Sequence, residues 1–218
     1  MHPESVPLQL SAGGAILSCD LNIPENAIGL VLFAHGSGSS RLSVRNQAVA
    51  QMLRRHHLAT LLFDLLTPAE EAEDASIGHL RFNIGLLSLR LAIVSRGMMD
   101  DGHSQHLPLG YFGASTGAAA ALLAAAALGE NIRAVVSRGG RPDLAGETLR
   151  YVKAPTLLIV GERDDQVLRL NERAYTELQC KKSFAVVPNA THLFDEPGTL
   201  PEVARLAADW FEKHFEKD

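Results

Sequence analysis

The sequence lacks the features that would assign it to several common classes of protein. Only two of its 218 residues are cysteine, Cys19 and Cys180, and they stand in no metal-binding or redox spacing. We expect both to be free thiols, as in a reducing cytoplasm. The longest apolar run, 118–128, is too short to cross a bilayer, and the N-terminus lacks the basic-then-apolar pattern of a signal peptide. These absences predict a cytoplasmic protein with no membrane association.

The charge balance argues against another class. A formal net charge of −5 does not favour a general nucleic-acid binder, although local patches stay possible. Hydrophobic residues at 46% and charged residues at 21% are ordinary for a globular domain. There is no internal repeat, low-complexity linker or shift in composition. We therefore predict a single domain over residues 1–218, present as a monomer or a homodimer.

Strand-like and helix-like segments alternate along the chain. The predicted strands are 6–10 and 15–21, which form a hairpin around Gly13-Gly14, and then 28–34, 58–63, 107–112, 132–136, 156–160 and 183–187. The predicted helices are 45–56, 82–99, 118–128 and 201–215, and segment 67–77 is either a loop or a short helix. This alternation predicts an α/β fold, with a mostly parallel sheet and helices on both faces. In such sheets, ligands bind beyond the carboxyl ends of the strands.

A five-residue segment, Gly113-Ala114-Ser115-Thr116-Gly117, connects a predicted strand to an alanine-rich helix. Glycine two residues before and two after a serine is the nucleophile-elbow pattern, in which a tight strand-to-helix turn exposes the serine. The hydroxyl then lies at a helix N-terminus, where free N–H groups stabilise negative charge. Because a small polar loop could show the same pattern, the interpretation depends on finding the partners of Ser115.

A serine nucleophile needs a base, usually histidine, and a carboxylate that orients the base. In this fold they follow the serine in the order acid, then histidine. His192 lies in the loop after the last predicted strand, and Asp164 follows the strand before it. Asp165 is the alternative acid, although we expect it to be the N-cap of a helix that begins near Gln166. Glu162 is a weaker candidate, and Asp195 is too close to His192 in sequence to orient it.

The reaction also needs donors for the developing oxyanion. The usual donors are the N–H after the nucleophile, here Thr116, and an N–H from the loop after an early strand. The loop His35-Gly36-Ser37-Gly38-Ser39-Ser40 is the source of the second donor, with Ser37 preferred and Gly38 next. Phosphate binding by this loop is less favoured, because Arg41 replaces the last glycine of GxGxxG and no GK[ST] ending follows.

Charged residues near the predicted carboxyl edge suggest two further roles. Arg41 and Arg138 could bind an acidic group of the substrate, as could Arg45 and Arg141, while solvation or pairing with nearby acids is as good an explanation for each. A second cluster, 100–106, holds two aspartates and two histidines. We interpret it as a loop rather than a metal site, because it lies at the opposite end of the elbow strand.

The elbow, the glycine-rich loop, the Gly161-Glu162-Arg163-Asp164 turn and the Ala190-Thr191-His192 loop together resemble the α/β-hydrolase superfamily from about residue 28 onward. The chain is most similar to short, cap-poor members such as dienelactone hydrolases. The resemblance implies about eight strands, no large cap, and acyl hydrolysis without a cofactor or metal. Dienelactone hydrolases carry a cysteine nucleophile, whereas this chain has Ser115.

We therefore expect a serine hydrolase that cleaves a small carboxylic ester or thioester, with Ser115, Asp164 and His192 as the triad. An anionic substrate is favoured if Arg41 or Arg138 faces the site. Two other functions stay open. The same site could transfer the acyl group to an alcohol, or the fold could serve as a non-catalytic binding module.

Overall fold

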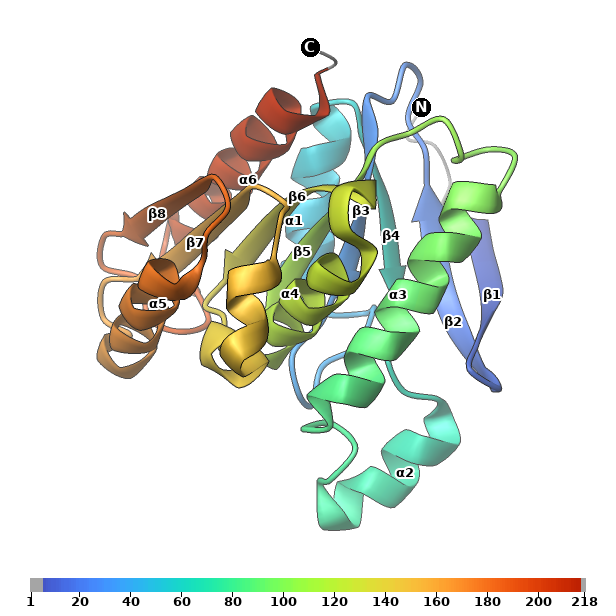
Figure 1. The fold of residues 1–218 in the computed structure, drawn as a ribbon, viewed down its shortest axis with the longest axis horizontal. Helices are drawn as coiled ribbons and strands as arrows, with labels where there is room; N and C mark the ends of the chain where they lie inside the picture. The colour runs from blue at the N-terminus through green and yellow to red at the C-terminus, as the bar shows by residue number, and fades with distance from the viewer. Residues whose placement is uncertain (1–5, 217–218) are drawn as a thin grey trace.

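The computed structural model describes residues 6–216. An eight-stranded sheet forms the centre of the molecule, with the spatial order β1-β2-β4-β3-β5-β6-β7-β8 (Figure 1). Its strands are β1 (Val6–Ala12), β2 (Ala15–Asn22), β3 (Gly29–Ala34), β4 (Leu58–Phe63), β5 (Leu109–Ala114), β6 (Ile132–Arg138), β7 (Thr156–Gly161) and β8 (Lys182–Val187). The predicted strands and hairpin are confirmed, with ends that differ by up to two residues.

The pairing of the strands sets where ligands can bind. β1 and β2 pair antiparallel, as do β2 and β4, and every other neighbouring pair from β4 to β8 is parallel. β3, β4, β5, β6 and β7 are buried almost throughout, because helices cover both faces of the sheet. The carboxyl ends of these strands therefore meet at one edge of the sheet.

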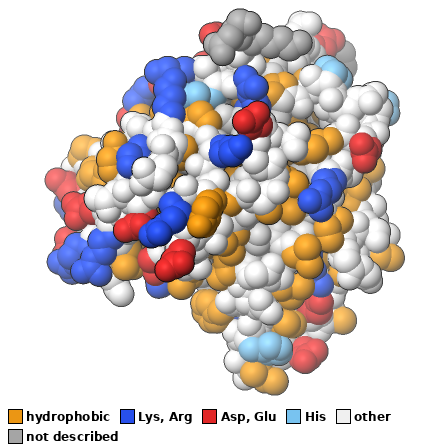
Figure 2. All heavy atoms as spheres, in the orientation of Figure 1, with side chains coloured by type: hydrophobic (Ala, Val, Ile, Leu, Met, Phe, Trp, Pro, Cys, Tyr) orange, Lys and Arg blue, Asp and Glu red, His pale blue; other side chains and the backbone are white. Residues whose placement is uncertain are grey.

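Helices cover the sheet on both faces. α3 (Ile84–Asp100), α4 (Thr116–Leu128) and α5 (Asp165–Glu177) lie in front of the sheet in Figure 1, while α1 (Val44–Arg55) and α6 (Thr199–Phe215) lie behind it. Two short 3-10 segments, η1 (Gly129–Asn131) and η2 (Pro142–Tyr151), flank β6 in the sequence. The buried side chains form two hydrophobic clusters, one on each face of the sheet. The surface in Figure 2 carries acidic and basic side chains intermixed, in keeping with the small net charge.

Segment 67–77, for which the sequence left loop or short helix open, forms α2 (Pro68–Ile77). Thr67 is its N-cap, and a complete capping box joins Thr67 to Glu70, with Pro68 at the first helical position. This pattern is visible in the sequence and would have predicted the helix without any apolar periodicity. α2 lies beyond the carboxyl edge of the sheet (Figure 1), next to the loop that follows β3.

The cysteines and the possibility of a membrane-spanning helix can also be examined in the structure. Within residues 6–216, Cys19 and Cys180 are free thiols, and burial raises the pKa of Cys19 to about 12. No helix in the same range combines the length and apolar character needed to cross a membrane.

Candidate active site

Ser115 lies in the turn between β5 and α4, with backbone angles φ 51° and ψ −123°. A residue other than glycine rarely adopts a positive φ, so the turn holds Ser115 in a strained conformation. Two glycines make the turn possible. A Cβ on Gly113 would lie 2.5 Å from Ala118 Cα, and one on Gly117 would lie 2.1 Å from the carbonyl oxygen of Ala34. The segment therefore has the backbone geometry that the elbow pattern predicts.

Asp164 and His192 come together at the carboxyl ends of β7 and β8. His192 Nδ1 lies 2.6 Å from Asp164 Oδ2, and the carboxylate is the less exposed partner. Asp164 occupies the N-cap position of α5, yet its side chain makes no capping bond, because it faces the imidazole. Close packing fixes the two loops. A Cβ on Gly161 would lie 2.4 Å from the carbonyl oxygen of Ala190.

Among the described residues, none of the alternative acids bonds to His192. Asp165 is the first residue of α5 rather than its N-cap, so the capping role expected for it is wrong: the helix begins one residue earlier than the sequence suggested. Glu162 accepts a hydrogen bond from the Asn189 N–H at 2.7 Å. Asp195 pairs with Arg45 at 3.3 Å. Of these carboxylates, Asp164 is the one within hydrogen-bond distance of His192.

Ser115 and His192 line one hollow of about 240 Å³, which we call the Ser115 hollow. His192 Nδ1 faces Asp164, so Nε2 is the ring nitrogen left to act on a hydroxyl. The hollow also contains residues from the loop after β3, from α1 and from the end of β6. Its lining is Gly36, Ser37, Ser39, Ser43, Arg45, Asn46, Ala114, Ser115, Arg138, His192 and Leu193.

The glycine-rich loop after β3 is held in place from both ends. His35 is buried; its Nε2 accepts the Leu65 N–H at 3.0 Å, and its Nδ1 lies 3.0 Å from the carbonyl oxygen of Gly36. Burial lowers the pKa of His35, which keeps the ring neutral with its proton on Nδ1. At the other end, the Ser37 N–H donates to Thr116 Oγ1 at 2.9 Å. The loop therefore contacts the elbow directly, and the Ser37 N–H that the sequence predicts as an oxyanion donor is bonded to the Thr116 side chain.

The two arginines named as possible substrate ligands lie in opposite surroundings. Arg138, the last residue of β6, is 7% exposed and lines the Ser115 hollow. Arg41 forms ion pairs with Asp20 and Asp64 and lines none of the hollows found at this edge. Two carboxylates already neutralise Arg41, which argues against the predicted role of Arg41 as a substrate ligand.

Arg138 has no carboxylate partner among the described residues. Its nearest polar contact is Asn46 Oδ1 at 3.5 Å, its guanidinium lies 5.8 Å from the centroid of the Phe194 ring, and its Nε has no hydrogen-bond partner. Burial, and then the charge of Arg45, lower the pKa of Arg138 to about 10, so it stays charged at neutral pH. A buried cation without a counter-ion is costly, and an anionic ligand would offset that cost.

Sequence reasoning missed Asn46, which is 3% exposed and contacts Arg138 from α1. A signal was available. Asn46 shares the buried face of the helix with Val49, Ala50 and Leu53 at the spacing of an amphipathic helix. A polar residue in that register has to bond to something inside the protein.

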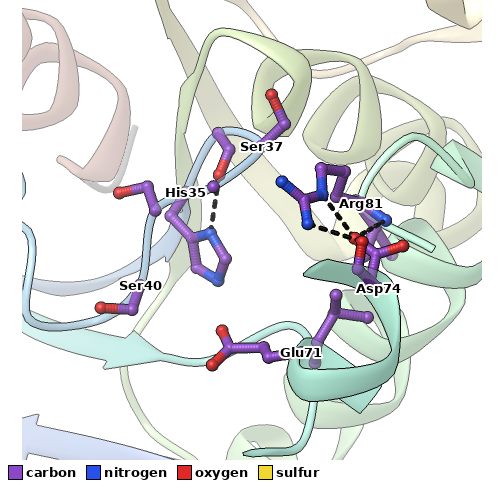
Figure 3. A pocket seen from close by; sticks show the side chains of 11 residues that line it. His35, Ser37, Ser40, Glu71, Asp74 and Arg81 are labelled. Carbon is purple, nitrogen blue, oxygen red and sulfur yellow. Dashed lines mark hydrogen bonds and ion pairs between the residues drawn. The ribbon is translucent and has the colours of Figure 1, made fainter. Parts of the chain in front are cut away.

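A second hollow, of about 290 Å³, lies between the glycine-rich loop and α2; we call it the α2 hollow. It shares Gly36, Ser37 and Ser39 with the Ser115 hollow. Figure 3 shows Arg81 turned toward Asp74, with Glu71 on the same helix and His35 across the cavity. Asp74 is 1% exposed and is bonded to Arg81 Nε and to the Leu80 and Arg81 N–H groups. The arginine of this hollow is therefore neutralised internally.

The site contains no grouping of metal ligands. Among the described residues, no three His, Cys, Asp or Glu side chains are placed to hold a metal ion, and residues 100–106 are no exception.

The mostly parallel eight-stranded sheet, with Ser115 in a strained turn after β5, Asp164 after β7 and His192 after β8, has the architecture of an α/β hydrolase. A dienelactone hydrolase from Anabaena variabilis, solved by crystallography, is 52% identical and superimposes with a TM-score of 0.97, over 99% of this chain and 100% of that one. Est1E from Butyrivibrio proteoclasticus is 15% identical with a TM-score of 0.82, over 98% and 100% of the two chains, which shows a common fold. No family model matches the sequence. The chain belongs to the dienelactone hydrolase family.

The curated relatives have another name. A Mycobacterium tuberculosis protein named "Putative phosphoribosyl transferase" is 56% identical over 208 residues, which are 95% of this chain and 46% of that protein. The chain thus spans less than half the length of the curated relatives that it matches. The name belongs to a protein that is more than twice as long as the matched region.

Proposed function

We propose that this protein is a serine hydrolase that cleaves a small carboxylic ester or thioester through an acyl-enzyme. The observation that carries the proposal is the His192–Asp164 pair at 2.6 Å, which lies at the same hollow as Ser115 in its strained turn. A serine, a histidine and a carboxylate in this chain order form the proton-transfer system of acyl hydrolases. The fold family supports the proposal, since the named structural relatives are hydrolases or esterases.

The reaction proceeds in two balanced halves. Ser115 Oγ forms a bond to the acyl carbon, its proton passes to His192 Nε2, and the carbonyl electron pair moves onto oxygen. When that pair returns, the bond to the leaving alcohol or thiol breaks, and His192 gives the leaving group its proton. In the second half, water attacks the acyl carbon and gives a proton to His192. The bond to Ser115 Oγ then breaks, His192 returns the proton to Oγ, and the acid is released. Asp164 holds the imidazole in the required tautomer and stabilises the imidazolium.

We further propose that the substrate carries a negative charge on its acyl portion. Arg138 supports this, because it is buried at the wall of the Ser115 hollow and has no carboxylate partner in the part of the chain that the structure describes. Arg45 lines the same hollow, but it already has Asp195 as a counter-ion. The hollow therefore contains one uncompensated positive charge within reach of a small acyl group, which suits a single carboxylate.

A fluorophosphonate probe tests the proposed nucleophile. We expect one adduct per chain, mapped by mass spectrometry to the peptide that contains Ser115, and loss of labelling in both Ser115→Ala and His192→Ala. Heat-denatured protein is the control for non-specific labelling. A folded wild-type protein that takes up no probe, or takes it up at another residue, would contradict the proposal and favour a binding module.

A further inference from the structure

We infer that the side-chain hydroxyl of Thr116 is a hydrogen-bond donor to the oxyanion, in addition to the backbone N–H of Thr116, and that it takes the place of the Ser37 N–H. The inference rests on the proposed serine-hydrolase function and adds a catalytic side chain to it. Its starting observation is that the Ser37 N–H, the preferred oxyanion donor, is directed at Thr116 Oγ1 at 2.9 Å.

The contact is built into the junction between the loop and the elbow. Thr116 is 4% exposed at the first turn of α4, immediately after the nucleophile. Gly36 brings the loop against the nucleophile, since a Cβ there would lie 3.0 Å from Ser115 Cβ. Loop and elbow are therefore too close for a water molecule to stand between them at this point, and the threonine hydroxyl satisfies the Ser37 N–H instead.

The Thr116 hydroxyl can still donate a hydrogen bond. A threonine hydroxyl accepts hydrogen bonds and donates one. Thr116 Oγ1 accepts from Ser37, and within residues 6–216 it donates no hydrogen bond of its own. The substrate oxyanion, forming on the carbon attacked by Ser115, would lie next to the Thr116 N–H and supply that acceptor.

The arrangement makes the hydroxyl a stronger donor than an isolated one. The Ser37 N–H withdraws electron density from Oγ1, and hydrogen bonds in such a chain strengthen one another in a site shielded from water. The contribution grows as charge accumulates on the substrate oxygen, so it stabilises the transition state more than the bound ester. No covalent bond to the threonine forms or breaks, and its proton stays on Oγ1.

Thr116→Val and Thr116→Ser form a matched pair that tests the inference. Valine keeps the branched shape and removes the hydroxyl, whereas serine keeps the hydroxyl and removes the methyl group. For p-nitrophenyl esters we expect Thr116→Val to lower kcat about 100-fold with little change in KM, and Thr116→Ser to stay within about fivefold of wild type. Thermal unfolding of both variants controls for folding.

A thionoester, in which sulfur replaces the carbonyl oxygen, separates donation to the oxyanion from simple positioning of the loop. Sulfur is a weak hydrogen-bond acceptor, so the wild type should prefer the oxygen ester strongly, and Thr116→Val should reduce that preference about tenfold. If Thr116→Val slows both esters equally, or slows neither, the inference is wrong.

The rate of Ser115 phosphonylation by the fluorophosphonate probe separates failure of the proposed hydrolase function from failure of the Thr116 donor. No labelling of wild type overturns the hydrolase and the donor together, whereas labelling at equal rates in wild type and Thr116→Val overturns the donor alone.

Discussion

The Ser115 hollow and the α2 hollow lie on two sides of one glycine-rich loop, and each has an arginine in its wall. In the α2 hollow, Arg81 is bonded to Asp74, a carboxylate that is 1% exposed. In the Ser115 hollow, Arg138 is more buried than Arg81 but has no carboxylate within ion-pair distance among the described residues. A neutralised arginine is typical of a structural contact, and an uncompensated one of a binding site. The comparison predicts that matched changes in the two hollows will have different effects.

The largest difference is expected between two carboxylate substitutions. Asp164→Asn should lower kcat for p-nitrophenyl esters about 10⁴-fold, because an amide opposite Nδ1 favours the wrong tautomer of His192. Asp74→Asn is the matched change in the α2 hollow and should leave kcat within about threefold of wild type. Steady-state kinetics on both variants measures this. A similar loss in both would show that the two hollows form one functional unit.

The two arginines provide the next comparison. Arg138→Met should raise KM about 10- to 100-fold for a p-nitrophenyl ester whose acyl chain ends in a carboxylate, and should leave KM for the neutral ester of equal length nearly unchanged. Arg81→Met should change neither constant appreciably. The ratio of kcat/KM for the charged and neutral esters is the measurement. If Arg138→Met leaves that ratio at its wild-type value, the anionic substrate has to be abandoned.

For thermal stability we expect the opposite ranking: Arg81→Met should have the larger effect and Arg138→Met the smaller. Arg81→Met leaves Asp74 buried without its guanidinium, so we expect the Tm to fall by several degrees. Arg138→Met removes a buried charge that has no ionic partner, so we expect an unchanged or higher Tm. Calorimetry of the two variants beside wild type checks both directions. An equal decrease in both would mean that Arg138 also stabilises the fold.

The smallest effect concerns the pH dependence of stability in the α2 hollow. Burial raises the pKa of Asp74, but hydrogen bonds from Arg81 and from two backbone N–H groups outweigh it, so the pKa is lowered overall. The resulting stabilisation is complete above the usual carboxyl pKa and is lost as the pH falls through the lowered value. The difference in unfolding free energy between wild type and Asp74→Asn should therefore shrink from pH 7 toward about pH 3. Urea titrations at several pH values would show it, and a difference that grew in acid would contradict the assignment.

Much of this architecture could be predicted because strong local patterns coincide with the global fold. β3 and β4 are mostly apolar and buried throughout, and the elbow glycines permit a turn that other residues would obstruct. Ser115, Asp164 and His192 could then be selected as candidates, because they occur in the order typical of the fold and each follows a predicted strand. Such features depend on neighbours in sequence, so a single chain displays them.

The rest depends on contacts between distant segments. Arg41 and Arg138 look alike in sequence, and their difference comes from Asp20 and Asp64, which the sheet brings to Arg41 alone. The Ser37–Thr116 hydrogen bond joins residues 79 positions apart. α2 is a different case. Its capping box is visible in the sequence. Because the helix is acidic and mostly exposed, however, it has no apolar periodicity that would predict it.

The most direct test of the account is the mass of the protein quenched in acid during turnover of a p-nitrophenyl ester. The account predicts a chain heavier by one acyl group, located on the peptide that contains Ser115, together with a burst of one p-nitrophenol per chain. Ser115→Ala should show neither. Turnover at the wild-type rate in Ser115→Ala, or an acyl group found on a different residue, would contradict the proposal that Ser115 is the nucleophile.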